Sequence, residues 1–465
     1  MKEFFKDNKV ILILILLLGL GLRLWNLNKP EGMWNDEYIT YSISMMKFPF
    51  DFFQGIKTNC HAPLHYFYLK LWMMIFKNFD FMLRLSSLVP NLLGCLVMYH
   101  VGKNYQTKDR SILLGLACCT IASISSFLIY FSQEVRIYSL IFLLSSLILL
   151  YSIKIYECPS KKHYWFYTLF CVLLILEHTI GFVYVIFNSF GLIAFRQKQK
   201  KKGDSDFLIP AISGLILALP VIPFIFRIFA HPTYFSQWWA PFNWSKIFFY
   251  FTDLFSPVLK NLTNSPMNFY RQIINHDVIN VGFILFALVP AGICLFLIIK
   301  SNIDSKRINK YLLSVFLATF LTVLIAAIAG KIIFLTKYLT ELYPILILMT
   351  ALGWVHLYSR NTRIMLATVY IFMTLFFIVV SHTSAIRLVR TEGHNLPVVA
   401  MNELNIQKND KIVFLYYPAR MFTKYIDIKN YKTTSIDKYN FPEVLNKGTT
   451  YDAFKHGYED YQVFF

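Results

Sequence analysis

Long apolar segments recur along this chain and are separated by short polar ones. They span residues 10–27, 82–101, 111–131, 137–156, 164–178, 179–195, 207–229, 279–299, 311–329, 338–358 and 364–381. A helix needs about 20 apolar residues to cross a bilayer. The pattern therefore predicts a polytopic α-helical membrane protein with about 11 transmembrane helices.

Two regions depart from that pattern. The apolar segment 62–76 is too short for a crossing and predicts an interfacial or re-entrant helix inside a loop spanning residues 28–81. Residues 382–465 are polar, with 11 Lys and Arg and 9 Asp and Glu, and the stretch that starts at Lys411 predicts a strand after a turn. We expect residues 1–381 to form a transmembrane module and 382–465 a small extracytoplasmic α/β or α+β domain.

Composition and charge predict on which side of the membrane the termini and the polar segments lie. The chain is 56% hydrophobic and 15% charged, with a formal net charge of +19. The polar segments 2–9, 103–110, 154–162, 196–206, 300–310 and 360–363 hold 20 Lys and Arg against 7 Asp and Glu. The positive-inside rule then places the N-terminus in the cytoplasm and the C-terminus outside an inner or plasma membrane, provided that 62–76 does not cross. No separate basic domain exists, so the charge does not indicate nucleic-acid binding.

The external loops then hold the candidate chemistry. Asp36 and Glu37 follow the first apolar segment, and adjacent carboxylates near a membrane are costly unless they are paired, hydrated or bound to a metal. One reading is a general base that acts on an acceptor hydroxyl or amine, and the other is a solvated acid pair.

A histidine pair follows in the same loop. His61 and His65 are four residues apart and flank Pro63, and Tyr66 comes next. A histidine pair with a carboxylate is one way to bind a divalent metal. The alternative is a pair of interfacial rings that hydrogen-bond to backbone or lipid headgroups, with His61 capping the helix.

Further candidates lie at other predicted outer ends. Arg136 opens an apolar segment beside Glu134 and Tyr138, and a specific lipid phosphate or bulk headgroups would satisfy its charge. Lysines beside an external helix end depart from the positive-inside rule and indicate an anionic ligand, against the alternative of solvated loop residues. The candidate residues at these predicted outer helix ends are Arg84, Glu177, His178, Lys331, Lys337 and Tyr338.

In this order the motifs resemble a known family. Asp36-Glu37, His61-x-Pro-Leu-x-Tyr66, Arg84-Leu, Ser132-Gln-Glu134-x-Arg136-x-Tyr138 and Lys337-Tyr338-Leu with Pro344 follow one another along residues 10–358. Together they are similar to the GT-C glycosyltransferases related to protein O-mannosyltransferases and to the aminoarabinose transferases of lipid A, the family-39-like enzymes.

The resemblance implies a polyprenyl-phosphate-linked sugar donor and a lipid, glycan or protein acceptor on the outer face. It implies that Asp36 is the catalytic base and that Glu37 orients the acceptor or a metal. Members of the family differ in whether a divalent metal is needed, so no cofactor is assigned, and Glu37 and His61 are the candidate ligands. The implied substrate-binding residues are His61, His65, Tyr66, Arg84, Glu134, Arg136, Tyr138, His178, Lys331, Lys337 and Tyr338.

This chain departs from the family pattern at two places. It has His-Ala-Pro-Leu where relatives have His-Pro-Pro-Leu, and Lys337-Tyr338 where relatives often have Arg-Tyr. Lysine binds phosphate as a point charge and lacks the bidentate fork of arginine.

Two other functions compete with glycosyl transfer. A transporter or flippase for lipid-linked glycans would place charges along a path inside the crossings, where this chain has few. An O-antigen polymerase or ligase is expected to have an arginine-rich external loop, whereas the loop 230–278 contains only Arg271.

Overall fold

The computed structural model describes most of the helical part of the chain and three short strands. The described residues are 8–25, 27, 33, 35–58, 62–77, 79–105, 110–196, 213–214, 216, 219, 242–244, 246–247, 250–251, 278–303, 307–332, 334–357, 359–383, 411–414, 432–435 and 461–464. The chain divides into two compact units. One comprises Met1–Leu27 with Ile43–Arg387, and the other comprises Asn28–Ser42 with Leu388–Phe465.

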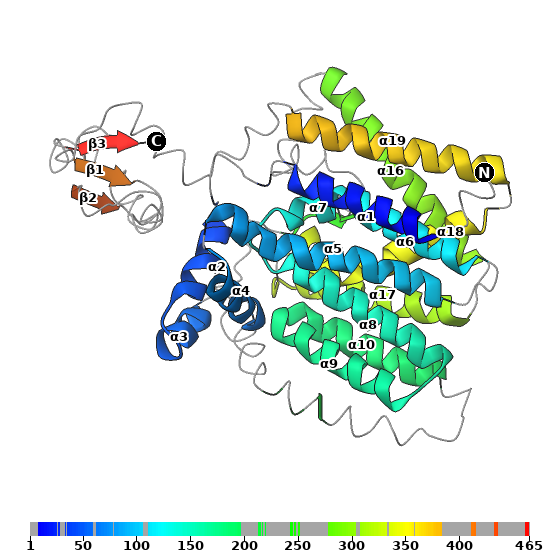
Figure 1. Cartoon of the computed structure of the whole chain (residues 1–465), viewed down its shortest axis with the longest axis horizontal. Helices are drawn as coiled ribbons and strands as arrows, with labels where there is room; N and C mark the ends of the chain where they lie inside the picture. The colour runs from blue at the N-terminus through cyan, green and yellow to red at the C-terminus, as the bar shows by residue number, and fades with distance from the viewer. Residues whose placement is uncertain are drawn as a thin grey trace. The chain divides into compact units, whose positions relative to one another are not determined.

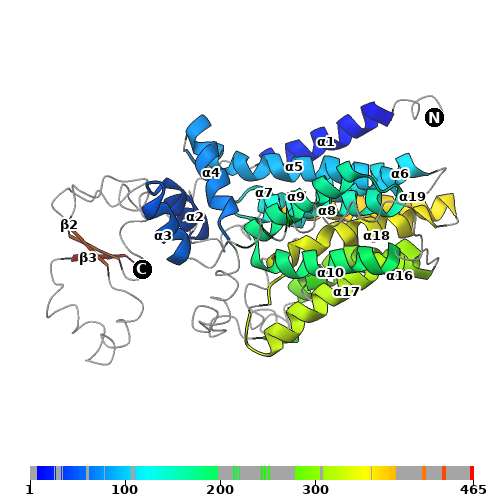
Figure 2. The same ribbon diagram turned by 90° about the horizontal axis from the view of Figure 1, so that it is seen from below.

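The first unit is a bundle of long helices. Its helices are α1 (Asn8–Leu24), α5 (Asp80–Asn104), α6 (Ser111–Ile124), α7 (Ser126–Ser132), α8 (Tyr138–Glu157), α9 (Lys161–Glu177), α10 (Thr179–Arg196), α16 (Val278–Ile303), α17 (Arg307–Ile328), α18 (Tyr343–Val355) and α19 (Arg360–Thr383). Figures 1 and 2 show α5, α6, α8 and α9 running alongside one another. Every predicted apolar segment in the described part coincides with helix to within a few residues. The predicted segment 207–229 lies largely outside the described residues.

Four helices in the described part are long and apolar enough to cross a membrane, and a fifth span is added if α6 and α7 count as one. α6 and α7 are bent by 56° at Ser125, so the single crossing predicted over 111–131 is broken. The finding supports an integral membrane protein, while the predicted number of about 11 crossings stays a prediction.

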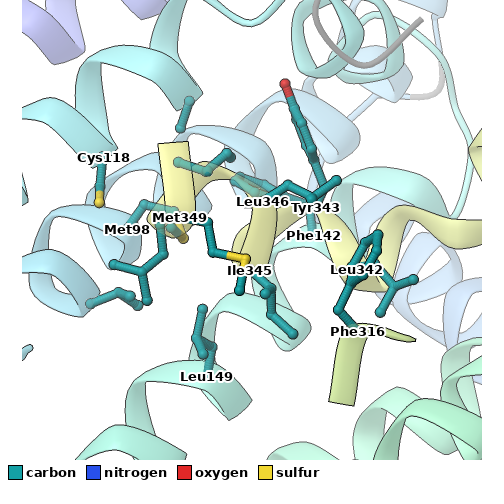
Figure 3. Packing of buried hydrophobic residues seen from close by; sticks show 14 of the residues in the cluster. Met98, Cys118, Phe142, Leu149, Phe316, Leu342, Tyr343, Ile345, Leu346 and Met349 are labelled. Atoms are coloured by element: carbon teal, nitrogen blue, oxygen red, sulfur yellow. The ribbon is translucent and has the colours of Figure 1, made fainter. Parts of the chain in front are cut away.

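The core of this bundle is centred on α18, which is apolar on all sides and buried along its length except at Trp354. A helix that is hydrophobic all round belongs in an interior. Figure 3 shows Ile345, Leu346 and Met349 of α18 among side chains of the neighbouring helices, including Phe142 and Leu149. α16 comes so close to α18 that a Cβ at Gly353 would lie 1.9 Å from the Leu297 carbonyl oxygen. Only glycine permits this approach.

Short helices follow α1 along the chain and precede α5. They are α2 (Asn35–Met45), α3 (Phe50–Thr58) and α4 (Leu64–Ile75), and α4 corresponds to the predicted interfacial segment 62–76. With 12 residues, α4 is too short to cross a bilayer. Lys70 Nζ of α4 donates hydrogen bonds to the carbonyls of Ser44 and Met46, at 3.0 and 2.7 Å, which fixes α4 to the end of α2.

The second unit contains a small parallel sheet. Its strands are β1 (Lys411–Phe414), β2 (Lys432–Ser435) and β3 (Tyr461–Phe464), in the order β2-β1-β3. Lys411 pairs with Lys432 on one side and with Tyr461 on the other. β1 begins at the residue where the sequence predicts a strand, while the choice between an α/β and an α+β domain stays a prediction.

Candidate functional site

A set of polar side chains gathers at the end of the bundle where α1, α7 and α9 end, and we call it the polar end. It is defined by His65, Arg136, Glu177, His178 and Lys337, with their direct contacts. These residues come from α4, the turn between α7 and α8, the junction of α9 and α10, and a 3-10 helix before α18. The three contact groups below tie those elements together.

The first contact joins α4 to α9. Pro63 is the N-cap of α4, so His65 lies in the first turn, where it is 1% exposed. Its Nδ1 lies 3.3 Å from Oε1 of Glu177, the last residue of α9. No well-aligned hydrogen bond reaches the His65 ring nitrogens or the Glu177 carboxylate oxygens from the described residues. Buried polar atoms without such bonds are rare, which makes this pair a candidate contact for a ligand.

The second contact joins the α9–α10 junction to the 3-10 helix η6 (Thr336–Leu342). The backbone is extended at His178, between the two helices, and His178 Nδ1 contacts Oε1 of Glu341. Glu341 is 1% exposed, and its Oε2 has no hydrogen-bond partner among the described residues. Pro344 lies in the first turn of α18, where its missing backbone donor costs no helical hydrogen bond.

The third contact places two cations beside one aromatic ring. The Arg136 Cζ lies 6.0 Å from the centre of the Tyr138 ring, and the Lys337 Nζ lies 5.7 Å from the same centre. Lys337 also lies 5.5 Å from the Tyr338 ring. These distances are within the range of cation–π attraction. Two positive charges on one ring favour an anion with several acceptor oxygens, such as a phosphate.

Other predicted residues are buried in the framework of this end. Arg84 is 0% exposed, and its Nη1 donates to the Leu27 carbonyl oxygen at 3.1 Å. Tyr66 and Glu134 are each 1% exposed. Tyr68, which the sequence did not single out, donates to the Ser86 carbonyl oxygen at 2.7 Å. Burial and then the nearby Glu177 carboxylate raise the pKa of Tyr68, so its hydroxyl stays a donor.

The remaining predicted residues are not members of these three contacts, or they lie outside the described residues. Lys331 is exposed in the turn after α17, and it makes no ion pair with another predicted residue in the described part. His61 lies outside the described residues. Asp36 and Glu37 belong to the second unit, in the first turn of α2, where acidic residues favour the positive end of the helix dipole. Glu37 is 1% exposed there.

Glu341 is the member of the polar end that the sequence reasoning missed. It lies inside an apolar segment, four residues after Lys337. An ionisable residue in a membrane segment is a functional candidate by itself, so that signal was present. Its pairing with His178 joins residues 163 positions apart, which no local pattern predicts.

The possible divalent metal stays a prediction. No group of three or more His, Cys, Asp or Glu side chains there is arranged to hold a metal ion. The predicted ligand pair, Glu37 and His61, stays a prediction because His61 is not described.

The backbone is similar to those of known membrane transferases. ArnT from Cupriavidus metallidurans in the apo state matches with a TM-score of 0.55 and 9% identity, over 96% of this chain and 94% of that one. The same protein bound to undecaprenyl phosphate matches with a TM-score of 0.53 and 10% identity, over 97% and 88%. The Archaeoglobus fulgidus oligosaccharyltransferase complex with zinc and sulfate matches with a TM-score of 0.51 and 10% identity, over 91% of this chain but 62% of that one.

These matches show that the chain has the GT-C glycosyltransferase fold. The resemblance predicted from the order of the motifs is thereby confirmed for the fold. No protein-family model and no curated protein sequence matches the chain. Sequence identities of 9–10% carry the likeness no further than the backbone.

Proposed function

We propose that this protein is a membrane glycosyltransferase that moves a sugar from a polyprenyl-phosphate donor to an acceptor at the extracytoplasmic face. The observation that carries the proposal is the pair of cations, Arg136 and Lys337, held at the Tyr138 ring in a GT-C fold. It is further supported by the similar backbone of ArnT in its complex with undecaprenyl phosphate.

The proposed reaction is a single displacement. Asp36 removes a proton from the acceptor hydroxyl or amine, and the freed electron pair forms a bond to the anomeric carbon of the sugar. The bond from that carbon to the phosphate oxygen breaks, and polyprenyl phosphate leaves. Arg136 and Lys337 stabilise the negative charge that develops on the phosphate. Attack from the side opposite the leaving group inverts the anomeric configuration.

The two His–Glu pairs belong to the same proposal as substrate contacts. His65 with Glu177, and His178 with Glu341, leave buried acceptor atoms without hydrogen bonds in the described part. Sugar hydroxyl groups are donors that would satisfy those carboxylate oxygens.

Asp36 is the residue whose removal tests the reaction most directly. We expect the Asp36→Asn variant to lose turnover almost completely, since the amide cannot accept the proton at neutral pH. The protein is purified, its co-purifying polyprenyl-phosphate sugars are identified by mass spectrometry, and turnover of those lipids is measured. Near-normal turnover by the variant would show that Asp36 is not the base.

Asp51 provides a matched control because it lies in the same predicted loop, is exposed and stands in the first turn of α3. The Asp51→Asn variant should turn over donor at the normal rate. If the purified protein moves a lipid-linked sugar across a vesicle membrane without breaking it, the transporter alternative replaces the proposal.

A further inference from the structure

A buried arginine in α1 has no carboxylate partner among the described residues. Arg23 is 0% exposed, and none of its hydrogen bonds in the described part involves an Asp or Glu. Removing an arginine from water costs several kcal/mol unless dipoles or charges compensate. The neutral hydrogen-bond acceptors around Arg23 must therefore be well placed. The segments that supply these acceptors are the ones that Arg23 ties together.

Two of these acceptors are carbonyls at the end of α6. The Arg23 Nη1 donates to the Ser123 carbonyl oxygen at 2.7 Å, and Nη2 donates to that of Ala122 at 3.2 Å. The last four carbonyls of a helix lack an intrahelical donor and carry the negative end of its dipole. Because α6 breaks at Ser125, its carbonyls are available, and Arg23 caps the break from the neighbouring helix.

Asn91 is the third acceptor, and it connects Arg23 to the turn that contains Arg136. The Oδ1 of Asn91 accepts from the Arg23 Nε and Nη2 at 3.0 and 2.9 Å, while its Nδ2 donates to the Ser139 Oγ at 3.2 Å. Ser139 in turn donates to the Phe131 carbonyl oxygen at 3.1 Å. Phe131 precedes the turn and Ser139 follows it. The hydrogen bond between them therefore holds the two ends of the turn together.

A fourth residue connects the same turn back to α1. Gln133 Nε2 donates to the carbonyls of Arg23 and Trp25, at 3.0 and 2.7 Å. The end of α1 and the turn are thus bound to each other twice, once through the Arg23 side chain and once through its carbonyl. All of these bonds lie within the first unit.

We propose that Arg23, Asn91 and Gln133 form a latch that fixes the turn 133–137 against α1 and thereby positions the Arg136 guanidinium for the donor phosphate. They are positioning residues, because none of them is required to touch the substrate. The role in phosphate binding rests on the proposed function, whereas the mechanical role of the latch does not.

The test compares two buried asparagines. Asn91→Ala removes the latch, and Asn188→Ala removes an equally buried amide that bonds Ser152, Tyr167, Tyr184 and Tyr311 in another part of the bundle. Both variants lose hydrogen bonds, so both lose some stability. Only Asn91→Ala is expected to speed hydrogen–deuterium exchange in residues 126–137, by about tenfold, the factor for roughly 1.4 kcal/mol.

The functional arm uses undecaprenyl phosphate as the probe in detergent-solubilised full-length protein. Asn91→Ala and Gln133→Ala should each weaken its binding by about tenfold, equivalent to one lost contact of roughly 1.4 kcal/mol, while Asn188→Ala leaves it unchanged. Faster exchange with unchanged binding overturns the positioning role. Unchanged exchange in Asn91→Ala overturns the latch itself.

The two arms also separate this inference from the proposed function. If the unaltered protein binds no polyprenyl phosphate, then the proposed function is wrong and the phosphate-positioning role fails with it. The exchange comparison between Asn91→Ala and Asn188→Ala still decides whether the latch holds the turn.

Discussion

Two buried polar regions of this bundle differ in how completely their hydrogen bonds are made. Around Asn188, the amide Oδ1 accepts from Ser152, Tyr167 and Tyr311 at 2.9, 3.1 and 2.8 Å, and Nδ2 donates to Tyr184. At the polar end, by contrast, the carboxylate oxygens of Glu177 lack well-aligned bonds from the described residues. A saturated polar cluster stabilises a fold, whereas an unsaturated one is costly and is expected where a ligand completes it.

The nature of the partners explains this difference. The Asn188 cluster uses neutral hydroxyl and amide groups, which satisfy one another at modest desolvation cost. The polar end uses charged and titratable groups in pairs, which cost more to bury. We therefore expect substitutions at the polar end to change activity and substitutions around Asn188 to change stability.

The largest expected effect is on turnover in Arg136→Met. This variant keeps the length and apolar stem of the side chain but removes its charge, so the charge of the leaving phosphate loses a donor. We expect turnover of the polyprenyl-phosphate donor to fall by about 10²–10³-fold, the usual loss for one donor to a developing anion. A steady-state assay checks this, and a loss below threefold would contradict a direct role in phosphate stabilisation.

A smaller effect is expected from Glu177→Gln. The amide has nearly the same shape but no charge, and it replaces a carboxylate that lies 3.3 Å from the His65 ring nitrogen. We expect turnover to fall by about tenfold, as for one weakened substrate contact, while the midpoint of thermal unfolding in detergent stays the same or rises. A marked loss of stability with full activity would show that Glu177, like Asn188, stabilises the fold and does not contact the substrate.

The smallest effect on catalysis is expected from Asn188→Ala. Here the loss should appear in the free energy of unfolding, at about 1–2 kcal/mol, because several buried hydroxyl groups lose a partner. Turnover per folded molecule should stay normal. Denaturant titration of the purified protein, with activity measured before unfolding, separates the free energy of unfolding from turnover. Lost turnover at normal stability would contradict the proposed difference between the Asn188 cluster and the polar end.

Much of the polar end was predictable because its residues violate local rules. Arg136 and Lys337 stand at the edges of apolar segments, where a charge needs a partner, and both lie beside the Tyr138 ring in the structure. Their roles, and that of Asp36, stay predictions. Glu341 was missed, although its position in an apolar segment is itself a signal.

The break of α6 and α7 was beyond sequence reasoning for a different reason. Residues 111–131 contain no proline, and serines such as Ser123, Ser125 and Ser126 are tolerated inside membrane helices, so the local sequence does not by itself predict a break at Ser125. The break is stabilised by groups distant along the chain. Arg23 binds the freed carbonyls, and the Ser125 hydroxyl, which caps α7, also contacts Tyr343 of α18 at 2.7 Å.

The amino-acid sequence alone determines that this is an integral membrane protein built of apolar helices, because the length and hydrophobicity of a segment suffice for that inference. The order of its short motifs also predicted the GT-C fold. Only the tertiary structure decided which polar groups meet: His65 with Glu177, His178 with Glu341, and Arg23 with the end of α6. Such partners lie far apart along the chain, and packing rather than local pattern brings them together.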